Sequence, residues 1–247
     1  MIDMILLAIL AAVTWFVASE GAWTAGTTFV CVLVSALLAM NFFEPLTLIL
    51  ARSLPDHDAR MDMIALVGLV AVFVFLSRLA AERMAPTYVQ VPGMVDNVGR
   101  WGFAAGTGYL TMAFLLTALH TTPLPREFLG FKPERANFFG MAPDRQWLGF
   151  TQYVTEKAFA RYDVALQMGA PMGTPHAFDG QYMAVGDAAK PYPNLIWASF
   201  PIRYATRRSQ FSNGGIVTMQ PTAPVRPAPA PSPGGGTPAG GGGSVGF

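Results

Sequence analysis

Two carboxylates, Glu20 and Glu44, lie beside the long apolar runs of this sequence and are its first candidates for chemistry. An ionisable side chain at membrane depth is costly to hold there, so by default it marks an ion or proton pathway. Gly21 follows Glu20 at a predicted turn, and Pro45 follows Glu44 at a predicted interfacial break. Because water could reach both positions, a proton- or ion-linked role and an ordinary interfacial role both stay open.

Asp96 and Arg100 are the second candidate pair. They are four residues apart, so on a helix they share a face. One interpretation is an ion pair in the first turn of a helix, where the macrodipole favours Asp96. The sharper hypothesis is that Asp96 anchors a hinge between the third and fourth apolar runs.

Glycines form a stripe at helical spacing in the fourth apolar run, at Gly99, Gly102 and Gly106. Gly102 and Gly106 make a GxxxG pattern, which lets two helix backbones approach closely in lipid. The pattern predicts either a dimer contact or a tight seam within the chain, and it does not distinguish the two.

Catalytic and metal-binding patterns are missing from the sequence. Its three histidines are scattered, the single cysteine lies in an apolar run, and no HExxH, CxxC, GxSxG or P-loop pattern occurs. The net charge of +1 gives no basic footprint for nucleic acid. We therefore expect no catalytic residues, cofactor, metal or nucleic acid, and a protein that is not an enzyme.

Composition points to lipid as the solvent of the first half of the chain. The sequence is 52% hydrophobic and 13% charged, whereas a soluble domain carries about 25% charged residues. Apolar runs at 2–18, 22–40, 63–76 and 101–119 approach or reach the length of a bilayer span. The backbone must be satisfied within each span, which favours helices. The prediction is an all-α integral membrane protein with about four transmembrane helices in residues 1–125.

The ends of these runs leave some alternatives. Leu79, Ala80 and Ala81 lengthen the third run if Arg78 snorkels. The first run could be a cleaved signal peptide, but it lacks the basic residues that precede such a segment. Pro45 predicts a break near Glu44, followed by a short interfacial or re-entrant helix over 46–51. Residues 54–62 are predicted as a polar loop and 86–92 as an extended linker.

The second half of the chain divides by composition. In residues 126–160, Asp144 can cap an amphipathic helix that reaches Ala160. This helix either lies on the membrane or packs on a small soluble domain. Residues 161–219 are predicted to be irregular, and the Pro/Gly-rich tail at 220–247 is predicted to be disordered, with low complexity. The face expected to be apolar comprises Trp147, Phe150, Thr151, Val154 and Ala158.

Lysine and arginine counts favour, by a small margin, an orientation with both termini in the cytoplasm. The cytoplasmic side would then carry Arg52, Arg60, Arg126, Lys132 and Arg135, against Arg78, Arg83 and Arg100 opposite.

The stretch Asp96-Asn97-Val98-Gly99-Arg100-Trp101-Gly102-Phe103-Ala104-Ala105-Gly106-Thr107-Gly108 resembles the opening of the fourth span in the colicin V production protein (CvpA) family. The resemblance covers about residues 1–160. Asn97 and Thr107 stand where the family has arginine, and Glu20-Gly21 replaces its Arg-Gly break, so a role tied to those arginines is in doubt. The family's positions are matched by Asp96, Val98, Phe103 and Gly108.

The resemblance implies a non-enzymatic, multi-pass protein of the bacterial inner membrane, linked to toxin production or export or to a broader envelope role. Its expected partners are the lipid bilayer and other membrane or envelope proteins, or further copies of itself. Two alternatives stay open. A small transporter or channel subunit could use broken helices at Glu20-Gly21 and Glu44-Pro45. A membrane-anchored interaction protein could bind a partner through residues 161–247.

Overall fold

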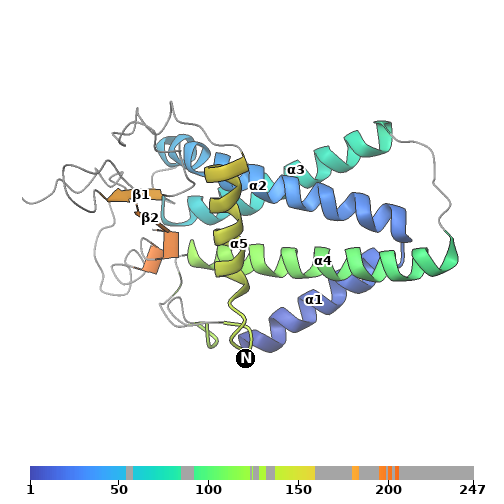
Figure 1. Ribbon diagram of the computed structural model, residues 1–247. Coiled ribbons are helices and arrows are strands. Elements are labelled where there is room, and N and C mark those ends of the chain that lie inside the picture. The colour runs from blue at the N-terminus through green and yellow to red at the C-terminus, as the bar shows by residue number, and fades with distance from the viewer. Residues whose placement is uncertain are drawn as a thin grey trace, which may run out of the picture. The chain divides into compact units, whose positions relative to one another are not determined.

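The computed structural model describes residues 1–53, 58–84, 92–122, 124, 128–131, 137–158, 180–183, 195–198, 200–201 and 204–205. It confirms the helical class (Figure 1). The chain also contains a short antiparallel pair of strands, which the sequence pattern did not predict. The elements are α1 (Ile2–Ala18), α2 (Ala22–Ser53), α3 (Asp58–Met84), α4 (Gly93–His120), α5 (Pro143–Tyr153), the π-helical turn η2 (Val154–Ala158), β1 (Gly180–Met183) and β2 (Leu195–Ala198).

Three helices are long and apolar enough to cross a membrane: Ala22–Thr47 within α2, Arg60–Met84 within α3, and all of α4. The fourth expected span, α1, is apolar but has 17 residues, which is the lower limit of about 17–25 for a bilayer span. Large apolar side chains such as Phe16, Phe42 and Phe75 face outward. An apolar outer surface on hydrogen-bonded helices is what a lipid solvent requires.

The central helix of the bundle is α4, which packs along both α1 and α2, while α3 packs mainly along α2. Accordingly, 56% of an 18-residue apolar stretch of α4 is buried, against only 11% of the corresponding stretch of α3. Successive helices run in opposite directions, so the bundle has two ends (Figure 1). We call them the turn end, with Glu20 and Asp96, and the α5 end, with His120 and Asp144. Two core clusters lie toward the α5 end, one around Phe43, Leu66 and Phe114 and the other around Leu6 and Met112.

The predicted break at Glu44 is wrong, because α2 continues through Pro45 to Ser53. Proline removes one backbone donor and normally disrupts a helix interior. Here buried side chains flank it on both sides, Phe43 at 0% and Thr47 at 1% exposure. The Thr47 hydroxyl also donates to the carbonyl of Phe43. Packing on both sides of the proline therefore keeps the helix together, and no separate interfacial helix forms over 46–51.

The predicted capping of the amphipathic helix by Asp144 is also wrong. The N-cap residue of α5 is Ala142, with no side-chain cap. The helix buries Trp147, Leu148 and Thr151 against the bundle and leaves Phe150 40% exposed, so the apolar face differs from the expected one. The α-helical pattern also ends at Tyr153, where η2 begins. The helix packs against α4 of the bundle and not on a separate soluble domain, and its position at the membrane surface stays a prediction.

The described part of the C-terminal extension pairs β1 with β2, with Gly180 opposite Ala198. Just after β2, Phe200 and Tyr204 are buried in the core cluster that includes Phe43. The polar loop predicted over 54–62 is wrong for residues 58–62, because α3 begins at Asp58 and buries Met61 and Asp62. The rest of that loop at 54–57, residues 86–91 of the predicted linker at 86–92, and the predicted disordered tail at 220–247 lie outside the described residues.

Candidate functional site

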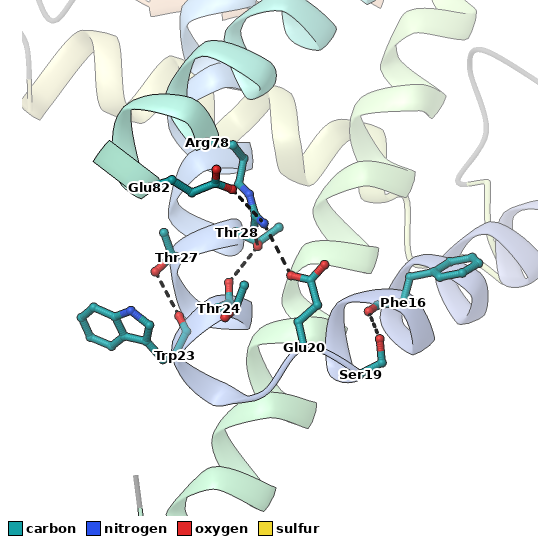
Figure 2. A network of polar contacts seen from close by, with 9 residues as sticks. All are labelled: Phe16, Ser19, Glu20, Trp23, Thr24, Thr27, Thr28, Arg78 and Glu82. Carbon is teal, nitrogen blue, oxygen red and sulfur yellow. Dashed lines mark hydrogen bonds and ion pairs between the residues drawn. The ribbon is translucent and has the colours of Figure 1, made fainter. Parts of the chain in front are cut away.

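The turn end is built around Gly21, which joins α1 to α2. Its φ angle of 90° is one that glycine adopts without steric cost, and the Gly21 carbonyl accepts a hydrogen bond from Ala25 N–H. This sharp reversal places the Glu20 side chain over the side of α2 (Figure 2). The predicted tight break between the first two helices is therefore present, and it positions an acid.

Glu20 forms an ion pair with Arg78 from α3, with an oxygen-to-nitrogen distance of 3.6 Å (Figure 2). Arg78 also lies 3.8 Å from Glu82 and donates to the Thr28 hydroxyl on α2. The Glu20 side chain is 47% exposed and that of Arg78 is 27% exposed, so solvent screening keeps this pair modest in energy. The network nevertheless ties the α1–α2 turn to α3. Sequence spacing could not reveal it, because 58 residues separate the two charges.

Asp96 does not pair with Arg100. Its Oδ1 accepts a hydrogen bond at 2.9 Å from the backbone N–H of Ala22, the first residue of α2. That donor has no partner within α2 itself, so a carboxylate from a neighbouring helix satisfies it and complements the positive end of the helix. Among the described residues Arg100 Nε is buried without a hydrogen-bond partner. The predicted pair is therefore replaced by a contact between helices, and the hinge hypothesis stays a prediction.

The glycines of α4 serve different neighbours. A Cβ atom at Gly99 would lie 3.2 Å from Ala22, and one at Gly106 would lie 3.1 Å from the Phe29 ring, so both permit close contact with α2. A Cβ atom at Gly108 would lie 2.9 Å from the Leu10 carbonyl of α1. At Gly102 nothing lies within 4 Å. The predicted stripe thus contains two positions of an intramolecular seam and one outward-facing position.

Glu44 and Pro45 are both exposed on α2, near the α5 end. The structure does not bring them together with Glu20, which lies at the turn end of the bundle. The two acids first singled out therefore belong to separate places.

A buried ionisable pair, which sequence reasoning missed, lies at the α5 end. His120 Nε2 and Asp144 Oδ2 are 2.9 Å apart, and both side chains are 0% exposed. His120 is in the last turn of α4 and Asp144 in the first turn of α5. A positive charge is favoured at a helix C-terminus and a negative one at an N-terminus, so both helix ends suit this pair. The sequence signal at this place is Asp144 before an amphipathic run, a pattern that predicts an N-cap and gives no indication of a histidine partner.

Three polar atoms of this cluster have no hydrogen-bond partner among the described residues: His120 Nδ1, Asp144 Oδ1 and Trp147 Nε1. Buried polar atoms without partners are uncommon and costly. Aromatic rings enclose the histidine edge-on, with Phe131 at 5.0 Å and Phe200 at 6.4 Å between ring centroids. The cluster can hold a proton or donate and accept hydrogen bonds, but rings shut it off from water.

The connection before α5 is held against the first turn of α1. Asp3 Oδ1 accepts a hydrogen bond at 2.9 Å from Phe138 N–H, and Ile2 N–H donates to the Leu129 carbonyl at 3.0 Å. Phe138 and Ala142 have φ angles of 57° and 50°, in the left-handed region that side chains disfavour. Such conformations persist only where the surroundings hold them. The chain therefore fixes the position of α5 relative to α1 at a conformational cost.

These features define a helical membrane protein in which a small set of polar side chains, Asp3, Glu20, Asp96 and His120 among them, joins one segment to another. Among the described residues, no group of three or more His, Cys, Asp or Glu could hold a metal ion. The family model described as Colicin V production protein matches residues 2–139. The chain therefore belongs to the colicin V production protein family. Searches of curated proteins and of solved structures gave no match.

Proposed function

We propose that this protein is a multi-pass protein of the bacterial inner membrane that acts without catalysis, as an assembly factor for toxin production or export or for a broader envelope process. Membership of the colicin V production family supports the process. The apolar outer surface of the helices supports insertion in a bilayer. At the turn end, Asp96 and Glu20 make contacts between helices, which fits a structural role. In the described part of the chain, no group of His, Cys, Asp and Glu side chains could hold a metal ion.

The observation that carries the assembly role is the outward face of α4 around Gly102. Val98 is 77% exposed, and a Cβ atom at Gly102 would meet nothing within 4 Å. Val95, Val98, Gly102 and Ala105 are all exposed and follow one another at spacings of three and four, so they lie on one face. Small residues on a lipid-facing helix allow another helix to approach closely. Another membrane protein, or a second copy of this chain, could pack there.

Affinity purification from mild detergent, with identification of the associated proteins, tests this role. We expect the wild-type chain to retain partners or a second copy and Gly102→Leu to lose them, because the added side chain separates the helices. Gly68→Leu is the matched control, since Gly68 also has nothing within 4 Å and lies on α3. Equal recovery of the same associated proteins with wild type and Gly102→Leu would exclude this face as the contact.

A small transporter or channel subunit is the second candidate, supported by the charged pair Glu20–Arg78 beside the bundle. The continuity of α2 through Pro45 removes one of the two helix breaks on which this alternative depended. Purified protein in sealed vesicles should carry no ion or solute flux if the assembly role is correct. A flux that Glu20→Gln abolishes at unchanged protein level would favour the transporter.

The third candidate, a membrane-anchored interaction protein, places function in residues 161–247. Phe200 and Tyr204 are buried against the helices, so this part of the extension has a role inside the bundle. Deletion of residues 221–247 tests the remainder. If colicin or envelope phenotypes and co-purified proteins are unchanged, the tail is not the binding element.

A further inference from the structure

A short segment of the C-terminal extension is built into the core of the membrane domain. Phe200 is 1% exposed and Tyr204 is 5% exposed, although both lie well beyond the family match over residues 2–139. They share a core cluster with residues of α2, α3, α4 and α5. This part of the extension is therefore integral to the bundle, because two of its aromatic side chains complete the packing at the α5 end.

The Phe200 ring makes contacts on two transmembrane helices. Its centroid lies 6.2 Å from that of Phe43 on α2 and 6.4 Å from that of His120 on α4, and the Tyr204 ring lies tilted against it with 4.6 Å between centroids. Edge-on and tilted aromatic pairs at these distances are attractive beyond the area that they bury. One ring thus bridges two helices and covers the histidine.

The cluster beneath this ring would gain hydrogen bonds from water. His120 and Asp144 are fully buried, and with Trp147 they hold three polar atoms without partners in the described structure. Water could satisfy each of these atoms if it reached them. Aromatic burial therefore favours a closed end, whereas the unsatisfied polar atoms favour an open one. A balance of this kind makes local opening easier than unfolding of the whole bundle.

We propose that Phe200 and Tyr204 form an intramolecular plug that closes the α5 end of the helix bundle over the His120–Asp144 pair. The plug follows directly after β2, which ends at Ala198 and contacts α5. Displacement of the plug admits water to the buried pair while the helices stay assembled. This inference goes beyond the proposed assembly function and does not depend on it.

The test uses the full-length chain in unsealed membrane fragments, with Cys31→Ala as the background. Ala118→Cys on α4 serves as the reporter, because Ala118 is 3% exposed and belongs to the same core cluster as Phe200. A membrane-impermeant maleimide reacts with the thiolate, which requires water. Phe200→Ala combined with Tyr204→Ala should raise the labelling rate about tenfold or more, since labelling follows the population of the open state.

Two controls separate opening from unfolding. Tyr153→Ala removes an aromatic ring that is 62% exposed and should leave the labelling rate unchanged. A reporter at the turn end, Ala25→Cys, is 0% exposed and should stay protected in the plug variant. Unchanged labelling of the Ala118 reporter in the plug variant, or an equal rise at both reporters, would overturn the proposal.

A second measurement needs no new cysteine. Hydrogen–deuterium exchange of the plug variant against the parent should show faster exchange over residues 116–122, with no change at the α1–α2 turn. If residues 116–122 exchange at the same rate in the plug variant and in the parent, the plug proposal is contradicted. This outcome can be measured even if the cysteine variants fail to accumulate.

Discussion

Asp3 and Asp96 act alike at opposite ends of the bundle. Each accepts a hydrogen bond at 2.9 Å from a backbone N–H that belongs to a distant segment, Phe138 for Asp3 and Ala22 for Asp96. In lipid an unsatisfied backbone donor costs more than in water. The Asp96 carboxylate therefore fixes the start of α2 and the Asp3 carboxylate fixes the turn before α5, and each bond sets the relative position of two segments. At these two sites the role of the acid is positional.

Asp96 provides a test of this role with a built-in comparison. Asp96→Asn keeps an oxygen acceptor for the Ala22 N–H, so we expect its thermal stability in detergent to stay close to that of the parent. Asp96→Ala removes the acceptor and should cost about 0.5–2 kcal/mol, as loss of an N-cap does. Circular dichroism during heating measures both. A loss with Asp96→Asn as large as that with Asp96→Ala would show that the charge, not the hydrogen bond, matters.

The His120–Asp144 pair should show strong coupling. Because Asp144 is 0% exposed, His120→Phe leaves a buried carboxylate without its partner and should destabilise by about 3–5 kcal/mol. His120→Phe together with Asp144→Leu removes both polar groups and should be less destabilising than His120→Phe alone. Thermal unfolding of the single and double variants gives the coupling. Additive losses would mean that the two side chains do not interact in the folded protein.

At the scale of elements, α4 contacts its two main neighbours through different surfaces. It meets α2 through Gly99 and Gly106, and it meets α1 through Gly108. The GxxxG pattern predicted either a dimer contact or a seam within the chain, and its two glycines divide, because Gly106 contacts α2 whereas Gly102 faces outward. Spacing along a helix fixes which residues share a face, but the neighbouring helix decides which of them it meets. The pattern alone could not assign these partners, because it holds no information on where α1 and α2 lie.

Gly108 and Gly102 should therefore respond in opposite ways to a methyl group. At Gly108 a Cβ atom would lie 2.6 Å from Thr14 Oγ1 and 2.9 Å from the Leu10 carbonyl. The backbone carbonyl cannot yield easily, so Gly108→Ala should separate α1 from α4 and cost about 1–3 kcal/mol.

At Gly102 nothing lies within 4 Å, so Gly102→Ala should be neutral or stabilising by up to about 1 kcal/mol through helix propensity. Steady-state protein level in membranes and thermal stability in detergent measure both variants. Equal effects of the two substitutions would contradict the assignment of Gly108 to the α1–α4 seam.

At the scale of the whole molecule, the sequence predicts the helices that a lipid solvent requires. It does not predict the contacts between helices, which depend on packing. The apolar runs predicted α1, α2, α3 and α4 as helices, because hydrophobic length is a local property of the chain. The break at Pro45 was wrong because burial of Phe43 and Thr47 on either side holds α2 together. Glu20–Arg78 and His120–Asp144 are pairs between distant segments. No periodicity of a single sequence encodes which helices meet.

The order of the helices also predicts which residues share a side of the membrane. Ser19 and Met94 are exposed at the turn end, whereas Met141 is exposed at the α5 end, where α1 begins. Single cysteines at these three positions, in the Cys31→Ala background, should respond to an impermeant maleimide in intact cells after outer-membrane permeabilisation. The lysine and arginine counts favour, by a small margin, an orientation with the α5 end in the cytoplasm. Ser19→Cys and Met94→Cys should therefore label together, and Met141→Cys only after the cells are lysed.

The control is labelling after lysis, when all three positions should react, because each is exposed in the structure. Labelling of Met141→Cys alone in intact cells would keep the helix order and reverse the orientation. Labelling of Ser19→Cys and Met94→Cys from opposite sides would contradict the bundle itself, since the bond between Asp96 and Ala22 requires the start of α4 and the α1–α2 turn to meet at one membrane face.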